Sequence, residues 1–283
     1  MAVGTNGTGG VVRLAVSGVL MRASQIIQTA STLLLFAAVG ATPLAATRRG
    51  IARFWDDFEG ETEASFFPWE RDVATQFVRP GDHVLIAGCG SGRDTVAFLE
   101  YGCRVTAIDP APAALARARQ TLAARGLDTA LACVSIEDWR GAEPVDVVWF
   151  SWFTYGYIPT SRARVAALAN AAAQLKPGGR IVISYETGQP RNRAAVVARV
   201  VSRWVGNDWA LETGDRIVRV NGSAFTFEHR FTEDEFASEL RAAGLRIIGR
   251  STSAVVAEVI ASFATGFVRV DGSFRANVAA FGR

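Results

Sequence analysis

Short apolar segments alternate with helix-like segments through the middle of the chain, and this alternation restricts the fold more than any other feature. Five segments are short and apolar, as buried strands are: 83–87, 104–108, 130–134, 145–151 and 180–185. Helical patterns lie between them at 93–101, 111–125 and 161–175, the last ended by Lys-Pro-Gly-Gly. Parallel strands are normally covered by helices on both faces of the sheet. The sequence therefore predicts an α/β fold with a doubly wound, mostly parallel sheet.

The alternation is interrupted after residue 186. A helical pattern at 194–205 precedes a hairpin pattern at 217–231, "IVRVNGSAFTFEHRF", with Asn221-Gly222 as its turn. We interpret about 187–231 as a lid insertion. A capped helix is then expected from Thr232, followed by strands around Ile247 and Val255, and "FVRVDGSF" near the end can pair as a last strand.

The N-terminal part of the chain precedes this domain. Residues 1–10 are rich in Gly, Thr and Asn and are expected to be disordered. Residues 11–46 are apolar, and 23–47 carry no charge, which predicts a helical extension over about 11–50. Three interpretations remain open: a helix packed on the domain or on a second copy, contact with a membrane surface, and a leader. A polar stripe at helical spacing favours packing; its members are Arg13, Ser17, Ser24, Gln28 and Ser31.

Residues 51–75 mix aromatic and acidic side chains without a clear period. We interpret them as a capping segment, with Trp55 and Trp69 closing a pocket from above. The main domain is expected to span 76–283.

Composition excludes several classes of function. The net charge is +3 and no dense run of Lys and Arg occurs, which argues against nucleic acid as a partner. The two histidines, His83 and His229, are far apart, so no metal site is expected. The three cysteines lie in apolar contexts, as reduced thiols of a cytoplasmic protein do. We therefore expect a cytoplasmic protein, membrane-associated if segment 11–46 meets a bilayer.

Three glycines at alternate positions, Gly88, Gly90 and Gly92, follow the first predicted strand. A dinucleotide fingerprint would place its third glycine at position 93, where this chain has Arg93, and no Gly-Lys of a phosphate-binding loop follows. The second strand ends at Asp109, whose carboxylate can accept hydrogen bonds from both hydroxyls of a ribose. Asp94, directly after the loop, is interpreted as a helix N-cap.

Four stretches together make the chain resemble the class I S-adenosylmethionine-dependent methyltransferases. They are "VLIAGCGSGRDT", "VTAIDPAP", "VDVVWFSW" and "LKPGGRIVISY", in that order, and the resemblance covers about residues 70–260. It implies a Rossmann-like, seven-stranded type of sheet, S-adenosyl-L-methionine as cofactor, and methyl transfer as activity. Two alternatives stay open: a non-catalytic cofactor-binding or scaffold protein on the same fold, and an NAD(P)-dependent oxidoreductase.

The resemblance also implies cofactor contacts. The glycine loop, with Cys89, would pass close to the methionine part, and Asp109 with Pro110 would hold the ribose. After the third strand the family carries an acidic residue, where this chain has Ser135; this departure leaves the adenine contact open between Ser135, Ile136, Glu137 and Asp138. After the fourth strand, Ser151 would border the sulfonium.

The residues beyond the fourth strand bear on the acceptor. The chain has "FSWF" where nucleic-acid amino-methyltransferases carry [DN]-P-P-[FYW], which argues against base amines. Trp152, Tyr155 and Tyr157 are expected to line a pocket for a small apolar or aromatic molecule, methylated on O, N or S. Trp149 is expected in the core. Glu186 and His229 are the candidates for a general base.

Overall fold

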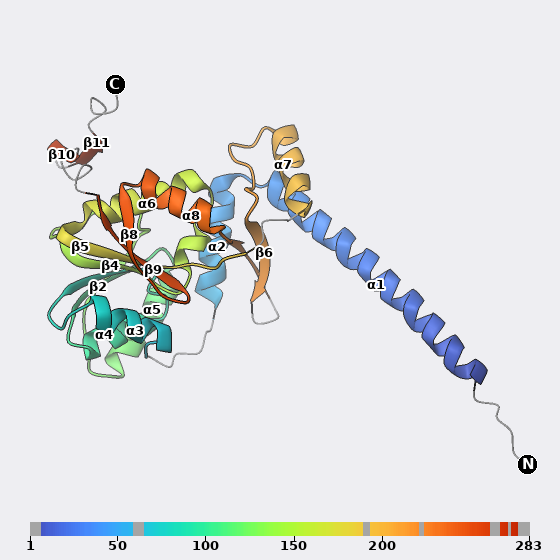
Figure 1. The fold of residues 1–283 in the computed structure, drawn as a ribbon, viewed down its shortest axis with the longest axis horizontal. Coiled ribbons are helices and arrows are strands. Elements are labelled where there is room, and N and C mark those ends of the chain that lie inside the picture. Colours follow the sequence, from blue (N-terminus) through green and yellow to red (C-terminus); the bar gives the residue numbers. More distant parts are fainter. Residues whose placement is uncertain are drawn as a thin grey trace, which may run out of the picture. The chain divides into compact units, whose positions relative to one another are not determined.

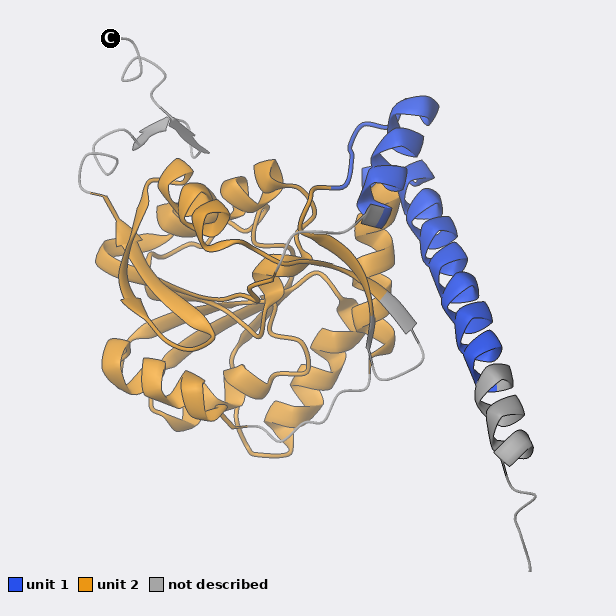
Figure 2. Ribbon diagram, turned by 45° about the vertical axis from the view of Figure 1, so that its right-hand side comes forward, with its two compact units in different colours: residues 1–44, 192–211 blue, residues 45–191, 212–283 orange. Residues whose placement is uncertain are grey.

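The computed structural model describes the chain except for residues 1–6, 59–64, 189–192, 221–223, 261–266, 271–272 and 277–283. The chain forms two compact units (Figure 2). Unit 1 consists of residues 1–44 and 192–211, and unit 2 of residues 45–191 and 212–283.

Unit 2 contains a seven-stranded sheet with the strand order β3-β2-β1-β4-β5-β9-β8 (Figure 1). Its strands are β1 (His83–Ala87), β2 (Arg104–Asp109), β3 (Ala130–Cys133), β4 (Val145–Phe150), β5 (Leu175–Ser184), β8 (Leu245–Arg250) and β9 (Ala254–Val259). The first five are parallel, and β9 runs antiparallel to both β5 and β8. The predicted doubly wound, mostly parallel sheet is confirmed.

Helices cover both faces of this sheet. The helices α3 (Pro68–Phe77), α4 (Arg93–Glu100) and α5 (Pro112–Ala123) lie on one face, and α6 (Ser161–Ala173) and α8 (Glu233–Ala242) on the other. Two further elements are α2 (Leu44–Asp57) and the 3₁₀ turn η1 (Thr154–Tyr157). Alternate strand residues pack into two hydrophobic cores on opposite faces of the sheet. Leu85 packs in the first core with residues of α6 and α8, and Ile86 packs in the second core with residues of α3, α4 and α5. Trp149 is buried in the second core, as predicted, and Phe150 in the first.

Two features differ from the sequence prediction, and a third is confirmed in part. Lys176–Gly179 belong to β5 and do not merely end a helix, because the β4–β5 pairing starts at Val145 and Leu175 and shifts register before Arg180. Strands β10 (Phe267–Val270) and β11 (Ser273–Ala276) pair with each other in a separate antiparallel sheet instead of extending the main one. The hairpin β6 (Asp215–Val220) and β7 (Ala224–His229) is present, whereas its Asn221-Gly222 turn lies outside the described residues.

Unit 1 is a pair of helices, α1 (Gly7–Ala41) and α7 (Arg193–Val205). The helix α1 begins at Gly7, inside the segment expected to be disordered. Three hydrogen bonds join the ends of the helices: Asn207 Nδ2 to Gly40 O (2.6 Å), Trp209 Nε1 to Thr42 O (2.8 Å) and Leu44 N to Asp208 Oδ1 (3.2 Å). The expected lid insertion is thus divided, because residues up to 211 belong to unit 1 and the hairpin to unit 2.

Candidate functional site

The glycine loop joins β1 to α4 at the carboxyl edge of the sheet. Gly88, Gly90 and Gly92 have φ angles of +74°, +52° and +91°, a region that residues with a Cβ rarely adopt. A Cβ on Gly88 would collide with the Thr154 side chain, whereas one on Gly90 would meet no atom within 4 Å. The backbone at Gly90 therefore faces open space, as a loop that lies against a ligand must.

Asp109 connects this loop to the end of β2. Asp109 is only 7% exposed, and its carboxylate accepts hydrogen bonds from Gly90 N to Oδ2 and from Ala111 N to Oδ1, both at 2.8 Å. Burial raises the pKa of Asp109, and the hydrogen bonds from Ala111 and Gly90 oppose that shift. Each carboxylate oxygen has a second lone pair, so two further donors can be accepted.

Asp94 and Ser151 form the wall of the site between the loop and β4. Ser151 Oγ donates to Asp94 Oδ2 at 2.5 Å, and both side chains are buried. The N-cap of α4 is Gly92, without a side-chain cap, so the interpretation of Asp94 as an N-cap is wrong. Cys89, also buried, has a thiol whose pKa burial raises well above its usual value.

A buried ion pair holds α3 against the glycine loop. Both Glu70 oxygens accept hydrogen bonds from Arg93, at 2.5 Å from Nη1 and 2.7 Å from Nη2. The guanidinium also lies 4.1 Å from the centre of the Phe67 ring. Burial raises the pKa of Glu70, although the hydrogen bond from Arg93 opposes the shift. Sequence reasoning missed this pair, because nothing in the spacing of residues 70 and 93 indicates it.

The helix α2 covers the start of α5. Asp56 Oδ1 accepts a hydrogen bond from Ala113 N at 2.8 Å, in the first turn of α5. Arg117 donates to the carbonyl oxygens of Asp56 (2.7 Å) and Trp55 (2.9 Å). The ring of Trp55 contacts that of Tyr157 at 4.9 Å between centroids, whereas Trp69 lies in α3.

The aromatic residues after β4 have different surroundings. Trp152 is exposed and Tyr157 is partly buried, so both can meet a ligand. Tyr155 lies in the core: it is fully buried between Phe231 and Phe236 and donates to Glu239 Oε2 at 2.6 Å. Tyr155 lies in the 3₁₀ turn η1, which directs its ring into the core. The alternation of side chains along a strand does not predict this direction, because the residue lies beyond the end of β4.

Glu186 follows β5 and is tied to the hairpin. Arg230 Nη2 lies 2.5 Å from Glu186 Oε2, and Arg230 Nε donates to Glu228 Oε1 at 2.5 Å. The pKa of Tyr157 is raised by burial and by the negative charges of Glu228 and Glu186. The carboxylates of Glu186 and Glu228 and the phenol of Tyr157 therefore lie near one another beyond the carboxyl end of β5.

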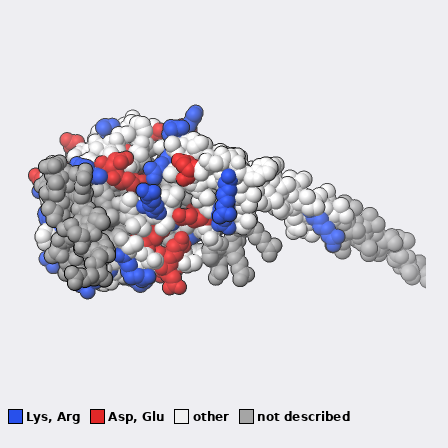
Figure 3. All heavy atoms as spheres, turned by 90° about the horizontal axis from the view of Figure 1, so that it is seen from above, with Lys and Arg blue, Asp and Glu red and all other residues white. Residues whose placement is uncertain are grey.

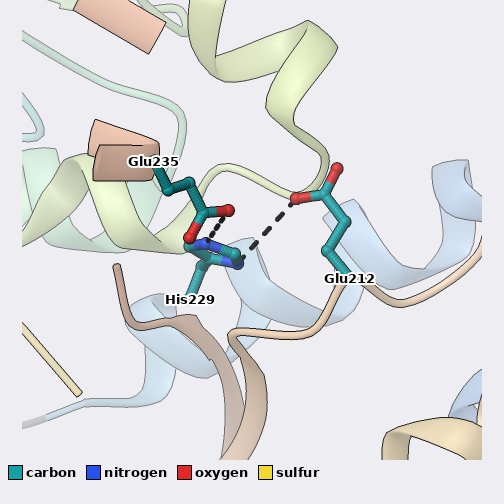
Figure 4. A group of neighbouring side chains, drawn as sticks. All are labelled: Glu212, His229 and Glu235. Carbon is teal, nitrogen blue, oxygen red and sulfur yellow. Dashed lines mark hydrogen bonds and ion pairs between the residues drawn. The ribbon is translucent and has the colours of Figure 1, made fainter. Parts of the chain in front are cut away.

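His229 is buried at the end of β7 with both ring nitrogens engaged (Figure 4). Nδ1 lies 2.7 Å from Asp215 Oδ1 and Nε2 lies 3.1 Å from Glu235 Oε1. Burial lowers the pKa of His229, but the hydrogen bonds with Asp215 and Glu235 outweigh it and raise the pKa. An imidazole held in this way has no free nitrogen with which to take a proton from an acceptor.

The carboxylates around His229 share a buried arginine. Glu212, His229 and Glu235 offer ligand atoms within 4.8 Å of one another, a spacing that suits a cation. Arg164 is fully buried beside them, and its Nη2 lies 2.7 Å from Glu212 Oε2 and 2.8 Å from Glu239 Oε1. The guanidinium of Arg164 already supplies the positive charge that a bound cation would bring. The cluster of Arg164, His229 and the surrounding carboxylates is therefore suited to holding the hairpin, α6 and α8 together.

The segment after β3 carries the departure noted in the sequence. Ser135 Oγ donates to Asp138 Oδ2 at 3.2 Å, and the side chain of Ile136 is buried. Glu137 lies 3.8 Å from Arg48 of α2, and Pro110 is exposed beyond the end of β2. A carboxylate is thus available here at Glu137 and at Asp138.

Comparisons with known proteins agree with this geometry. A family model described as a methyltransferase domain matches residues 84–179. Carboxy-S-adenosyl-L-methionine synthase of Geobacter metallireducens is 32% identical over 130 residues, covering 42% of this chain and 51% of its own length. The chain thus spans about half the length of such curated relatives. Cypemycin N-terminal methyltransferase of a Streptomyces species is 29% identical over 192 residues, covering 65% and 77%.

Solved structures show the same fold. A S-adenosylmethionine-dependent methyltransferase from Clostridium acetobutylicum has a TM-score of 0.53 at 15% identity, covering 75% of this chain and 98% of its own. The sugar N-methyltransferase of a Streptoalloteichus species has a TM-score of 0.51 at 16% identity, covering 73% and 91%. At these identities the likeness concerns the fold.

Proposed function

Because the chain belongs to the class I S-adenosylmethionine-dependent methyltransferase family, we propose that it transfers the cofactor's methyl group to a small, apolar or aromatic acceptor. The observation that carries this proposal is the glycine loop, whose open backbone at Gly90 is hydrogen-bonded to the buried carboxylate of Asp109. The dinucleotide-binding fingerprint of an NAD(P) site has a glycine at the position of Arg93, and in this chain Arg93 pairs with Glu70.

The residues present fit S-adenosyl-L-methionine. Gly88, Cys89, Gly90 and Gly92 would lie along its methionine part, and Asp109 with Pro110 would hold the ribose through its unused lone pairs. We assign the adenine side to Ser135, Ile136 and Glu137. Asp94, hydrogen-bonded to Ser151 and paired with Arg93, would line the site beside the cationic part of the ligand.

In this proposal the protein positions the methyl acceptor and excludes water from the reacting atoms. When bound, the cofactor supplies an electrophilic methyl group, so the protein need only hold the acceptor in line at about 3 to 3.5 Å. Trp152 and Tyr157, with Trp55 over Tyr157, are the side chains that we assign to the acceptor. Tyr155 is assigned a supporting role behind them, since its hydroxyl is used by Glu239.

A base is required only if the acceptor arrives as a protonated hydroxyl, thiol or ammonium. We assign this role to Glu186, which is partly exposed beside Tyr157, and not to His229, whose nitrogens are both engaged. Small-molecule acceptors are supported by relatives such as ubiquinone biosynthesis O-methyltransferase of Idiomarina loihiensis, 36% identical over 106 residues. We place the catalytic unit in the cytoplasm, where the cofactor is made.

Calorimetry with S-adenosylmethionine and its demethylated product tests the cofactor, and we expect micromolar binding. A turnover screen of phenols, amines, thiols and lipids tests the acceptor. Binding without turnover of any acceptor would favour a scaffold protein on the same fold. Binding of NADH with no response to the adenosyl cofactor would refute the proposal.

A further inference from the structure

The helix α1 exposes apolar side chains on several sides. Val19, Leu20 and Met21 are consecutive and are 67%, 64% and 64% exposed. Successive residues of a helix point about 100° apart, so these three cover more than half of its circumference. A helix that packs on one protein surface needs a single apolar stripe, whereas a helix in lipid can be apolar all round.

The central part of α1 has the length and mean hydropathy of a membrane span, with Arg22 near its start and the polar stripe of Ser24, Gln28 and Ser31 along it. Ser17–Ala41 is a stretch of 25 residues that is long and apolar enough to cross a bilayer, and only 11% of its apolar window is buried. At 1.5 Å per residue it is roughly 38 Å long, more than the ~30 Å of a hydrocarbon core. The hydroxyls of Thr29 and Thr32 donate to the carbonyl oxygens of Gln25 and Gln28 at 2.8 Å, which removes two unpaired donors.

The partner helix α7 has two unlike faces. One face carries small buried residues at a spacing of four, Ala194, Ala198 and Ser202, of which Ala198 lies against Gly40 of α1. A Cβ on Gly40 of α1 would collide with the backbone of Ala198, so the two helices approach as closely as small residues permit. Such packing is typical of helices within membranes, where apolar burial does not drive association.

The other face of α7 is apolar and exposed. Val196, Val200 and Trp204 follow at a spacing of four, and Trp204 is 91% exposed. Thirteen residues are too few to cross a bilayer, but they suit a helix that lies in its interface, where tryptophan is favoured.

The charges of this part of the chain are mostly basic, and the acid of unit 1 is Asp208, whose Oδ1 accepts the hydrogen bond from Leu44 N. Residues 1–55 contain no Asp or Glu, whereas Arg22 lies within α1 and three arginines follow it at 48, 49 and 53. The helix α7 adds Arg199 and the exposed Arg203, again without an acid. Figure 3 shows the described part of α1 as uncharged surface with one basic patch. Basic residues at the ends of apolar helices match anionic headgroups.

We propose that unit 1 is a membrane-docking element, in which α1 enters a lipid bilayer and α7 lies in its anionic interface with Val196, Val200 and Trp204 toward the acyl chains. The segment between β5 and β6, which is the first part of the lid insertion expected over about 187–231, then carries the second half of the membrane contact. A bilayer explains the exposed apolar side chains of α1, the short apolar face of α7 and the excess of arginine over acids in both helices together. A second copy would explain only the apolar faces.

Vesicle flotation of the full-length chain tests this proposal. The purified chain is mixed with phosphatidylcholine vesicles with or without about one-third phosphatidylglycerol and centrifuged through a density gradient. We expect the chain to float with the vesicles, and more strongly with the anionic ones. Replacing Val196, Val200 and Trp204 together by Asn should lower partitioning roughly tenfold or more. Ile248→Asn, which alters an exposed apolar residue of unit 2, is the matched control and should float like the unmodified chain.

Failure of the full-length chain to float would overturn the proposal, and flotation of the triple variant at the level of the unmodified chain would remove α7 from it. A lipid-free dimer that the triple variant dissociates, with no vesicle binding, would assign these faces to a second copy. A chain from which residues 1–41 have been cleaved in cells would identify a leader. Cofactor binding, measured in parallel, should be equal in all variants, so the result is independent of the catalytic proposal.

Discussion

The replacement Asp109→Asn tests the centre of the proposed cofactor site. Asp109 accepts one backbone N–H on each oxygen, from Gly90 and from Ala111. An asparagine of the same size can accept only one of them, because its amide nitrogen would face the other donor. It also presents one acceptor oxygen, and no charge, to the two ribose hydroxyls. The variant therefore loses a charge-assisted contact on both the protein side and the ligand side.

The magnitude follows from these contacts. A hydrogen bond to a charged group contributes about 1.5–3 kcal/mol, and the loss of the desolvated charge of Asp109 offsets part of it. We expect cofactor binding to weaken by about 1–3 kcal/mol, which is roughly five- to 150-fold in Kd. The free energy of unfolding without ligand should fall by about 1–2 kcal/mol, because one backbone N–H is left unpaired.

Isothermal calorimetry with the demethylated cofactor measures the effect, since this ligand binds without turning over. Urea unfolding of the same samples separates the loss of affinity from loss of structure. Asp128→Asn is the matched control, because it removes an exposed carboxylate of the same chain and should change neither quantity. An Asp109→Asn variant that binds as tightly as the unmodified chain would refute the assignment of the ribose to this carboxylate.

Three further outcomes are expected. Glu70→Gln removes one of the two carboxylates that contact the largely buried Arg93, Asp94 being the other, and should lower the free energy of unfolding by about 1.5–3 kcal/mol in urea titrations; a loss below about 0.5 kcal/mol would contradict a tightly held pair. Gly88→Ala places a Cβ at a φ of +74° against a side chain and should abolish cofactor binding in calorimetry, and retained affinity would show that the loop is not the site. Because the pKa of His229 is raised above 6.5 in the folded state, its contact with Asp215 contributes stability fully below about pH 6.5 and loses it as pH rises through the folded pKa. The melting temperature should therefore fall as pH rises through that range, and it should depend less on pH in the His229→Gln variant. Identical dependence of the melting temperature on pH in the two proteins would disprove the charged network.

The sheet was predictable because its signals are local. Each of the first four strands is a short apolar run, and the turn after it carries glycine, proline or polar residues. The course of the Lys-Pro-Gly-Gly stretch was not predictable, because whether residues 176–179 end a helix or continue β5 depends on pairing with β4. The division of the insertion at residue 211 also depends on contacts with α1, a segment about 150 positions earlier in the chain.

The candidate site shows the same limit. Gly88, Gly90 and Asp109 are visible in the sequence because their roles depend on backbone conformation and on the position at a strand end. Glu70 was invisible, since its importance arises from a contact with Arg93 across 23 positions. Burial of Tyr155 was invisible too, because an aromatic run has the same sequence whether a ring faces a ligand or the core.

The buried charges around the hairpin account for how a long insertion can return to one defined place. Arg164 of α6 binds Glu239 of α8 and Glu212 just before β6, and His229 closes β7 onto the same group. Buried ion pairs contribute little net stability, but they strongly disfavour arrangements in which one partner is missing. The hairpin can therefore dock in one register, and that register brings Arg230 to Glu186 at the candidate acceptor site. The network of Arg164, His229 and their carboxylates thus positions the hairpin at the candidate site. His229 serves this structural role, and its two engaged nitrogens leave it unavailable as a base.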